Sequence, residues 1–193
     1  MEIIFIRHGN TLGNEKKVYL GLTDEPLSQL GFDVIKKNAA ENIYPKCEHI
    51  YTSPLKRCIE TTEIIYPNQK YSIIKNLTEC DFGEYEYKSY NDLKYFTEYQ
   101  NWIDSGGMTA FPNGESGANF RKRSIKAFEQ IIENAKTNNY NKIAVVCHGG
   151  NIMSILEAFE ESKKSFYDWQ IKNGQGFLTQ FESNNLKIIK KLI

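Results

Sequence analysis

The stretch Ile3-Ile4-Phe5-Ile6, followed at once by Arg7-His8-Gly9, decides the fold class of this chain. A short run of apolar residues, three of them β-branched, is typical of a strand that is buried on both faces. The polar triplet marks the point where that strand enters a loop. The sequence therefore predicts a buried strand that delivers an arginine and a histidine at its carboxyl end.

Strand and helix patterns alternate along the rest of the chain. Further strands are predicted at residues 48–52, 71–77 and 142–147. Apolar residues recur with helical spacing over residues 27–35, 55–62, 118–135 and 152–159. This alternation predicts an α/β fold, a three-layer sandwich with a mostly parallel central sheet and helices on both faces. Residues 176–182 and 186–192, joined by Asn184-Asn185, predict a C-terminal hairpin at the edge of that sheet.

The length predicts one domain. The chain has 193 residues, and a domain usually takes ~100–200, so we expect a single domain over residues 1–193. Residues 81–111 depart from the strand and helix rhythm and are rich in aromatic residues, so we expect a small inserted cover there, around a helix that Ser89 could cap. Simple packing of that helix is favoured over an aromatic platform for a ligand. The packing residues would be Leu93, Phe96, Tyr99 and Ile103.

The composition excludes several classes of protein. Lys plus Arg and Asp plus Glu each number 24, with no long run of one sign, so we expect no nucleic-acid or membrane partner. No apolar stretch approaches the ~20 residues that span a bilayer. The four cysteines form no C-x-x-C pair and the three histidines lack the spacing of a zinc site, so we expect no metal. Because the first strand begins at Ile3, no room is left for a signal peptide, and we expect a cytoplasmic protein with reduced thiols.

The predicted strands deliver polar groups to one edge of the sheet, where open α/β sheets bind ligands. The sequences at the strand ends are Arg7-His8-Gly9, Ser53-Pro54-Leu55-Lys56-Arg57, Thr78-Glu79-Cys80-Asp81 and His148-Gly149-Gly150. Two imidazoles, two guanidiniums and two carboxylates are therefore expected on one rim. A phosphomonoester carries a charge of about −1.5 to −2, which two guanidiniums and an imidazole match without a metal.

His8 and Glu79 suit two chemical roles at such a rim. An imidazole nitrogen can attack phosphorus, and a positioned carboxylic acid can protonate the departing oxygen. Asp81 lies two residues from Glu79, and Glu84 and Glu86 are near, so the identity of the acid stays open at this point.

Local signals predict how the other groups reach the rim. Ser53-Pro54 predicts a helix start with the serine hydroxyl as N-cap. Arg57 then falls in the first turns, off the apolar stripe, and reaches back over the strand ends. Gly9 and Gly149-Gly150 let backbone N–H groups approach a ligand, and a helix that begins near Asn151 would point its positive end at the same place.

These residues resemble the motifs of the histidine phosphatase superfamily, also called the phosphoglycerate mutase-like family. The matching stretches are Arg7-His8-Gly9-Asn10-Thr11 with Asn14, Tyr19-Leu20-Gly21, Asp24-Glu25-Pro26-Leu27-Ser28, Ser53-Pro54-Leu55 with Arg57 and Thr61, Leu77-Thr78-Glu79, Gly114-Glu115-Ser116 and His148-Gly149. The resemblance covers nearly the whole chain. It implies a single histidine phosphatase domain in which residues 81–111 cover the active site.

The resemblance implies a metal-independent phosphomonoesterase that needs no cofactor and acts on a small phosphorylated metabolite. His8 would become the phosphohistidine, Glu79 would donate the proton, and the remaining residues would hold the phosphoryl group or the substrate. The implied catalytic residues are His8, Glu79, His148, Arg7 and Arg57. The implied substrate-binding residues are Asn14, Gly21 and Gly149. The expected partner is a small-molecule phosphate ester, and the assembly state stays open, with a homodimer as one candidate.

Departures from the family pattern bear on the substrate. Leu20 stands where relatives often have a polar residue, and Phe82 replaces a tyrosine common in the mutases. Residues 79–115 are too few for the long insertion that mutases use, which favours a hydrolase. The alternatives are a cofactor-dependent phosphoglycerate mutase and a non-catalytic phosphate-binding protein.

Two further patterns concern residues near the expected active site. Residues 82–86 are similar to the F-G-x-W-E-G pattern of broad-specificity and alpha-ribazole phosphatases, although Tyr87 occupies the second glycine position. Arg121 and Arg123 are interpreted as solvated or ion-paired residues of a long helix. Neither pattern selects a substrate.

Overall fold

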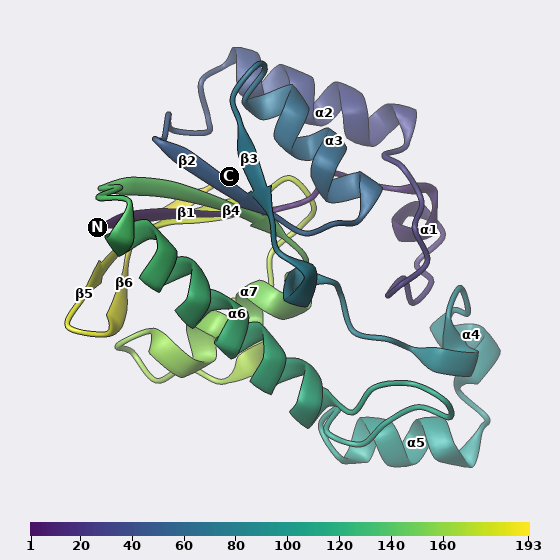
Figure 1. Ribbon diagram of the computed structural model, residues 1–193. Helices are drawn as coiled ribbons and strands as arrows, with labels where there is room; N and C mark the ends of the chain where they lie inside the picture. The colour runs from purple at the N-terminus through teal and green to yellow at the C-terminus, as the bar shows by residue number, and fades with distance from the viewer.

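A single mixed sheet forms the centre of the molecule (Figure 1). The computed structural model describes residues 1–193. Its strands are β1 (Glu2–Arg7), β2 (His49–Thr52), β3 (Tyr71–Ile73), β4 (Lys142–Cys147), β5 (Gly176–Glu182) and β6 (Asn185–Leu192), in the spatial order β3-β2-β4-β1-β5-β6. The pairs β1–β4, β2–β4 and β2–β3 are parallel, whereas β5 runs antiparallel to both β1 and β6. The predicted sheet with its C-terminal hairpin at the edge is confirmed.

Helices cover both faces of this sheet because successive side chains of a strand point to opposite sides. The four longest helices are α2 (Gln29–Ala40), α3 (Lys56–Ile65), α6 (Gly117–Thr137) and α7 (Gly149–Phe159). Ile4 and Ile6 of β1 pack with Ile35 of α2 on one face. Ile3 and Phe5 pack on the other face in the cluster that contains residues of α6 and α7. Figure 1 shows α2 and α3 on one side of the sheet and α6 and α7 on the other, so the predicted three-layer α/β sandwich is confirmed.

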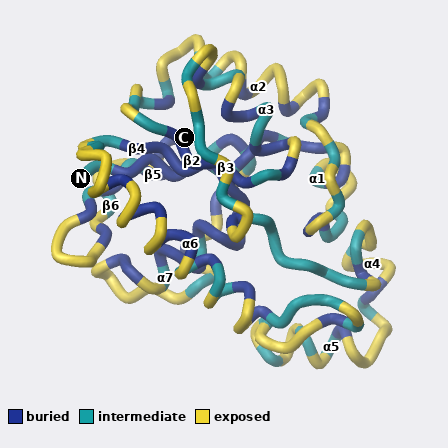
Figure 2. Tube along the Cα trace, viewed as in Figure 1, coloured by how far each residue is buried: buried dark blue, intermediate teal, exposed yellow.

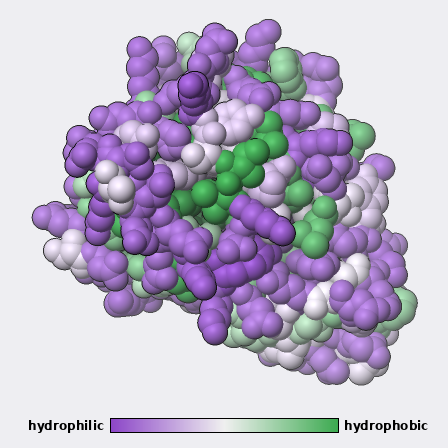
Figure 3. Space-filling view, in the orientation of Figure 1, coloured by the Kyte–Doolittle hydropathy of each residue, from purple (hydrophilic) through white to green (hydrophobic).

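Burial follows these layers. The strands at the centre are buried, while the outer faces of the helices are exposed (Figure 2). The surface in Figure 3 is mostly hydrophilic, with a narrow hydrophobic strip across the face in view. No helix of the structure combines the length and apolar character needed to cross a membrane.

The third strand is shorter than the sequence predicts. It ends at Ile73, and Lys75–Leu77 form a 3-10 helix, η1, in place of further strand. Ile73 pairs with Thr52, which is the last residue of β2. The chain beyond Ile73 therefore has no neighbouring strand with which to continue a ladder.

Residues 81–111 form two short helices in place of the one predicted. Ser89 caps α4 (Tyr90–Leu93) through a capping box with Asp92, and α5 (Thr97–Asp104) follows. In Figure 1 both helices lie apart from the sheet. An aromatic cluster holds the segment together and ties it to Tyr19. Its buried members are Tyr85, Leu93, Tyr99 and Phe111, with Tyr19, Phe82 and Trp102 packed against them.

Of the four residues predicted to pack this segment, two are buried and two are exposed. Leu93 and Tyr99 are buried, as expected. Phe96 and Ile103 are 49% and 39% exposed, so for these two residues the prediction was wrong. The helix is interrupted between α4 and α5, so Phe96, the N-cap residue of α5, does not continue the face of Leu93. Ile103 lies in α5, one turn after Tyr99, and the interruption does not account for its exposure.

The parallel register brings the carboxyl ends of three strands together. Arg7, the last residue of β1, pairs with Cys147, the last residue of β4. Thr52 of β2 pairs with Val146 of β4. The residues that follow these strands are His8, Ser53 and His148. Three polar side chains that are distant in sequence therefore enter one edge of the sheet.

Candidate active site

His8 is buried at the end of β1 and is held in one tautomer. Its Nδ1 lies 2.7 Å from the carbonyl oxygen of Gly9. Because a carbonyl only accepts, Nδ1 carries the proton and the lone pair sits on Nε2. Burial, and then the charges of Arg57 and Arg7, hold the pKa of His8 well below its ordinary value of 6.5. A neutral imidazole with a free Nε2 lone pair is the form that acts as a nucleophile.

His148 lies beside His8 and is also neutral. The two rings meet edge to face with their centroids 5.1 Å apart. Arg57 Nε donates to His148 Nδ1 at 3.3 Å, so the proton of His148 is on Nε2, which lies 2.8 Å from the hydroxyl oxygen of Ser53. Burial, Arg57 and the neighbouring His8 hold the pKa of His148 well below 6.5.

The predicted role of Ser53 as a helix N-cap was wrong. The helix α3 begins at Lys56, and its N-cap residue is Leu55, which makes no side-chain cap. The hydroxyl of Ser53 instead accepts from His148 Nε2 across the strand ends. The same hydroxyl also accepts from the backbone N–H of Leu55, at the longer distance of 3.4 Å.

Two arginines form the cationic part of the site. Arg57 is completely buried and donates to the carbonyl oxygens of Gly21 and Thr23 at 2.7 and 2.9 Å, in addition to His148. A guanidinium has five N–H donors, so two of them stay available for a ligand. Arg7 donates from Nη1 to the carbonyl oxygen of Ile171 at 2.6 Å. Its Nε is buried and has no hydrogen-bond partner within the protein, so it can donate to an anion.

The three residues implied to bind substrate lie around these groups. Asn14 accepts from the N–H of Thr11 and from Nδ2 of Asn173 through its side-chain oxygen, so its own amide N–H groups are left for a ligand. Gly149 begins α7 and lies against Arg7, because a Cβ there would come within 3.3 Å of the Arg7 guanidinium carbon. Gly21 accepts from Arg57 through its carbonyl and donates its N–H to Glu86, so it helps to orient the arginine, and its contact with substrate stays a prediction.

Glu79 is the carboxylate that adjoins this cradle. Its oxygens accept from the N–H of Cys80 at 3.0 Å and from that of Gly150 at 3.4 Å. Its charge acts on Arg7, where it opposes the lowering of the arginine pKa by burial. The carboxylate of Asp81 instead accepts from the N–H of Gly83 at 2.8 Å and closes a local turn. Geometry therefore favours Glu79 over Asp81 as the acid.

Arg123 fixes the position of Glu79. Its guanidinium donates to the carbonyl oxygens of Thr78 and Glu79 at 2.7 and 2.8 Å, and it forms an ion pair with Glu115 at 2.8 Å. The sequence predicts a solvated or an ion-paired arginine here, and the structure shows the ion pair, but no local pattern indicates which backbone atoms the arginine would hold.

Glu86 has a role that sequence reasoning missed. Its carboxylate accepts from the backbone N–H groups of Gly21, Leu22, Thr23 and Phe82, and from the hydroxyl of Thr23. The carbonyls of this same loop orient Arg57. The local signal for this role is the glutamate of the F-G-x-W-E-G pattern, which the sequence also offers as a candidate acid. Asn173, which also lies within 3.4 Å of His8 Nδ1, gave no local signal.

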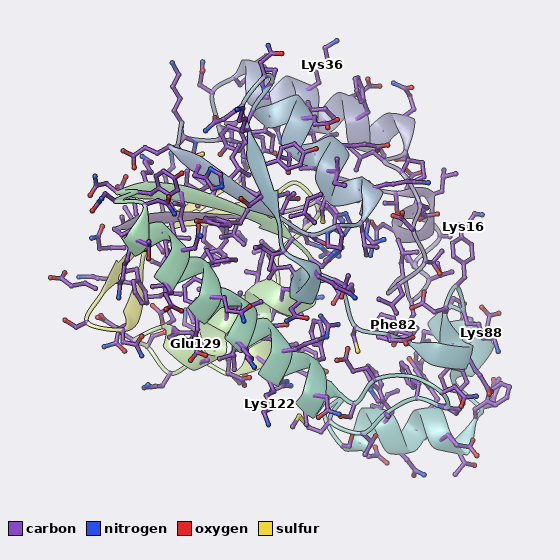
Figure 4. All side chains as sticks on the ribbon, in the orientation of Figure 1. Lys16, Lys36, Phe82, Lys88, Lys122 and Glu129 are labelled. Carbon is purple, nitrogen blue, oxygen red and sulfur yellow. The ribbon has the colours of Figure 1, made fainter.

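An aromatic pocket opens beside Glu79. Its walls include Glu79, Phe82, Trp102, Phe120, Met153 and Phe166. Phe82, labelled in Figure 4, projects from the chain that links the sheet to α4. Because Glu79 and Gly150 border both this pocket and the cradle, the two spaces adjoin.

Comparison with known proteins shows which family and which solved structures this chain resembles. The model of the histidine phosphatase superfamily (branch 1) matches residues 3–190. Phosphoserine phosphatase 1 of Hydrogenobacter thermophilus is 29% identical over 76% of this chain and 69% of its own length. The alpha-ribazole phosphatase of Shigella flexneri has a similar structure, with a TM-score of 0.85 and 22% identity over 100% of this chain and 96% of that one. The phosphoserine phosphatase of Entamoeba histolytica in complex with phosphoserine gives a TM-score of 0.82 and 22% identity over 98% and 95% of the two chains.

Folding should become less favourable as the pH falls below the ordinary pKa of histidine. The folded state holds His8 and His148 neutral, whereas the unfolded chain takes up protons below about pH 6.5, so stability is lost toward acid pH. Between pH 6.5 and 5.5 each such histidine accounts for about 1 kcal/mol. Urea titrations of the wild type and His8→Asn should show a loss smaller by about that amount in the variant. Equal losses in both proteins would contradict the neutral assignment of His8.

Removing the charge of Glu86 should weaken anion binding. In Glu86→Gln one acceptor oxygen becomes an NH2 group, the loop that orients Arg57 loses part of its support, and calorimetry should show inorganic phosphate binding about tenfold more weakly. The matched control is Glu84→Gln, because Glu84 accepts only from Asn113 and is exposed. Equal phosphate affinity in the two variants would show that Glu86 does not position Arg57.

Proposed function

The chain belongs to the histidine phosphatase superfamily and is a phosphatase, and from this premise we propose that it hydrolyses small phosphomonoesters through a phosphohistidine at His8, without a metal ion. One observation carries the proposal. His8 is neutral, its Nδ1 proton is engaged by Gly9, and its Nε2 lone pair is free in a site that contains the buried Arg57 and the half-buried Arg7.

The first half of the reaction transfers the phosphoryl group to the protein. The lone pair on His8 Nε2 attacks phosphorus, and the bond between phosphorus and the ester oxygen breaks. Glu79, in its acid form, gives its proton to that oxygen, so the alcohol leaves neutral. The phosphorylated ring then carries a positive charge, which the hydrogen bond from Nδ1 to the Gly9 carbonyl stabilises.

The second half returns the protein to its starting state. The Glu79 carboxylate takes a proton from water, whose oxygen attacks phosphorus. The bond between phosphorus and Nε2 breaks, the electron pair returns to the imidazole, and inorganic phosphate leaves. Glu79 therefore acts first as acid and then as base, which suits its place at the border between the cradle and the pocket.

The positive groups of the cradle support the transferring phosphoryl group. The free Nε of Arg7 and the two free donors of Arg57 supply charged hydrogen bonds. The N-terminus of α7 begins at Gly149 and adds the backbone N–H of Gly149 and the positive end of the helix dipole, while the N–H of Gly150 holds Glu79. His148 orients Arg57 by accepting from its Nε, and Asn14 adds its amide N–H groups. These protein groups match the charge of a phosphoryl dianion on their own.

Residues 81–111 would cover the leaving-group side of the site. They supply Phe82 and Trp102 to the pocket beside Glu79. The relatives named for phosphoserine and alpha-ribazole support a small phosphorylated compound as the substrate class.

Substitution at His8 and Glu79 should separate the two catalytic roles. His8→Ala should abolish turnover of every phosphate ester. Glu79→Gln should lower kcat for alkyl phosphates by ~10²–10⁴-fold, but far less for p-nitrophenyl phosphate, whose leaving group needs no proton. The measurement is steady-state hydrolysis in the presence of a chelator, in which wild-type turnover should be undiminished.

Asp81→Asn is the matched control for the acid. Its carboxylate holds a turn, so its loss should leave the ratio of alkyl to p-nitrophenyl turnover unchanged. Full activity of His8→Ala would refute the mechanism. A ratio that changes in Asp81→Asn but not in Glu79→Gln would reassign the acid.

A further inference from the structure

We propose that the pocket beside Glu79 binds an uncharged aromatic or heteroaromatic group, so that the preferred substrates are phosphomonoesters of alcohols that carry a flat ring. This inference rests on the proposed function, because it specifies the leaving group of the same reaction. It also sets this chain apart from relatives named for phosphoserine, whose leaving group is a charged amino acid.

The position of the pocket identifies it as the leaving-group side. Glu79 lies in its wall, and Glu79 is the group proposed to protonate the departing oxygen. Gly150 also lines it, and the N–H of Gly150 bonds to that same carboxylate. His8 and Arg57 do not line it, as expected if they hold the phosphoryl end. An ester bound with its phosphorus at His8 would therefore extend into this space.

Rings from several parts of the chain form the walls. Tyr19, Phe82 and Trp102 lie on the side of residues 81–111, and Phe120 and Phe166 lie on the side of α6 and the segment after α7. Tyr19 and Trp102 stand nearly perpendicular, with ring centroids 5.9 Å apart. Aromatic rings gain most from another ring placed edge to face or offset. The walls thus favour a flat apolar group over a branched or polar one.

The hydroxyls of the two tyrosines in the walls are already hydrogen-bonded. The hydroxyl of Tyr19 bonds to that of Tyr99 at 2.7 Å, and the hydroxyl of Tyr167 donates to the carbonyl oxygen of Gly106 at 3.3 Å. The pocket therefore presents ring surface more than hydrogen-bonding groups. A hydrophilic leaving group would lose its water there without gaining partners.

The single cation in the walls is neutralised. Arg121 pairs with Glu157 at 2.7 Å, and its guanidinium lies over the ring of Phe166, 3.9 Å from the centroid. No other lysine or arginine lines the pocket. A carboxylate on the leaving group would thus meet Glu79 and no free positive charge, which disfavours phosphoserine and phosphoglycerates.

Three esters of primary alcohols test the inference: 2-(indol-3-yl)ethyl phosphate, hexyl phosphate and O-phosphoserine. In the wild type, kcat/KM should be about tenfold higher for the indolyl ester than for the hexyl ester, as expected for a contribution of one to two ring contacts. It should be lowest for O-phosphoserine. Equal or higher efficiency for O-phosphoserine would overturn the inference and leave the proposed function standing.

Substitutions in the pocket then test whether its residues cause the preference for the indolyl ester. Trp102→Leu should bring the ratio of indolyl to hexyl efficiency close to one, whereas Tyr95→Leu, at a side chain 86% exposed outside the pocket, should keep the wild-type ratio. Met153→Phe fills the pocket from α7 without disturbing residues 81–111, and it should lower the efficiency of the indolyl ester more than that of O-phosphoserine. Thermal melts identify any variant that fails to fold. An unchanged ratio in folded Trp102→Leu and in Met153→Phe would place the preference elsewhere and overturn the inference.

A binding measurement separates the pocket from the reaction. Calorimetry with His8→Ala and the three esters reads affinity without turnover. Tighter binding of the indolyl ester, together with a wild type that hydrolyses none of the three, would support the pocket and refute the proposed function. Equal binding of all three esters would refute the pocket whatever the activity.

Discussion

The hydrogen bond from His8 Nδ1 to the Gly9 carbonyl is the interaction on which the rest of the site depends. It fixes the tautomer and leaves the lone pair of Nε2 free. Burial, together with Arg57 and Arg7, keeps the ring uncharged. A protonated His8 would be both an unreactive group and an additional positive charge in a closed cationic space. The local charge that attracts a phosphate therefore also keeps the nucleophile in its reactive form.

The buried charged groups of this site lower the stability of the folded protein. Arg57 is fully buried and relies on two loop carbonyls and an imidazole for its partners, while the buried Nε of Arg7 has none. An unpaired buried donor typically destabilises a protein by about 1–3 kcal/mol. Bound phosphate would supply the missing acceptor. The supporting groups, among them Glu86 and Arg123, hold loops in place so that these charges do not relax toward solvent.

The sequence best predicted the site residues that come directly after a strand. The apolar runs predicted β1 and β4, and the parallel register then placed His8 beside His148, 140 positions further along the chain. It was less informative about groups whose partners are remote. Nothing near Asn173 or Arg123 in sequence indicates the backbone atoms that they hold. Ser53 was misjudged for a related reason, since Ser-Pro is a common helix start and its competing partner, His148, is visible only in three dimensions.

Trapping the phosphorylated protein tests the central claim most directly. Rapid mixing with a radiolabelled substrate, an alkaline quench and peptide mapping would locate the phosphoryl group, and nuclear magnetic resonance would identify the nitrogen that carries it. The account predicts an acid-labile phosphoryl group on Nε2 of His8, because Nδ1 is held by Gly9. Label on Nδ1, on another residue, or on no residue at all during active turnover would contradict it.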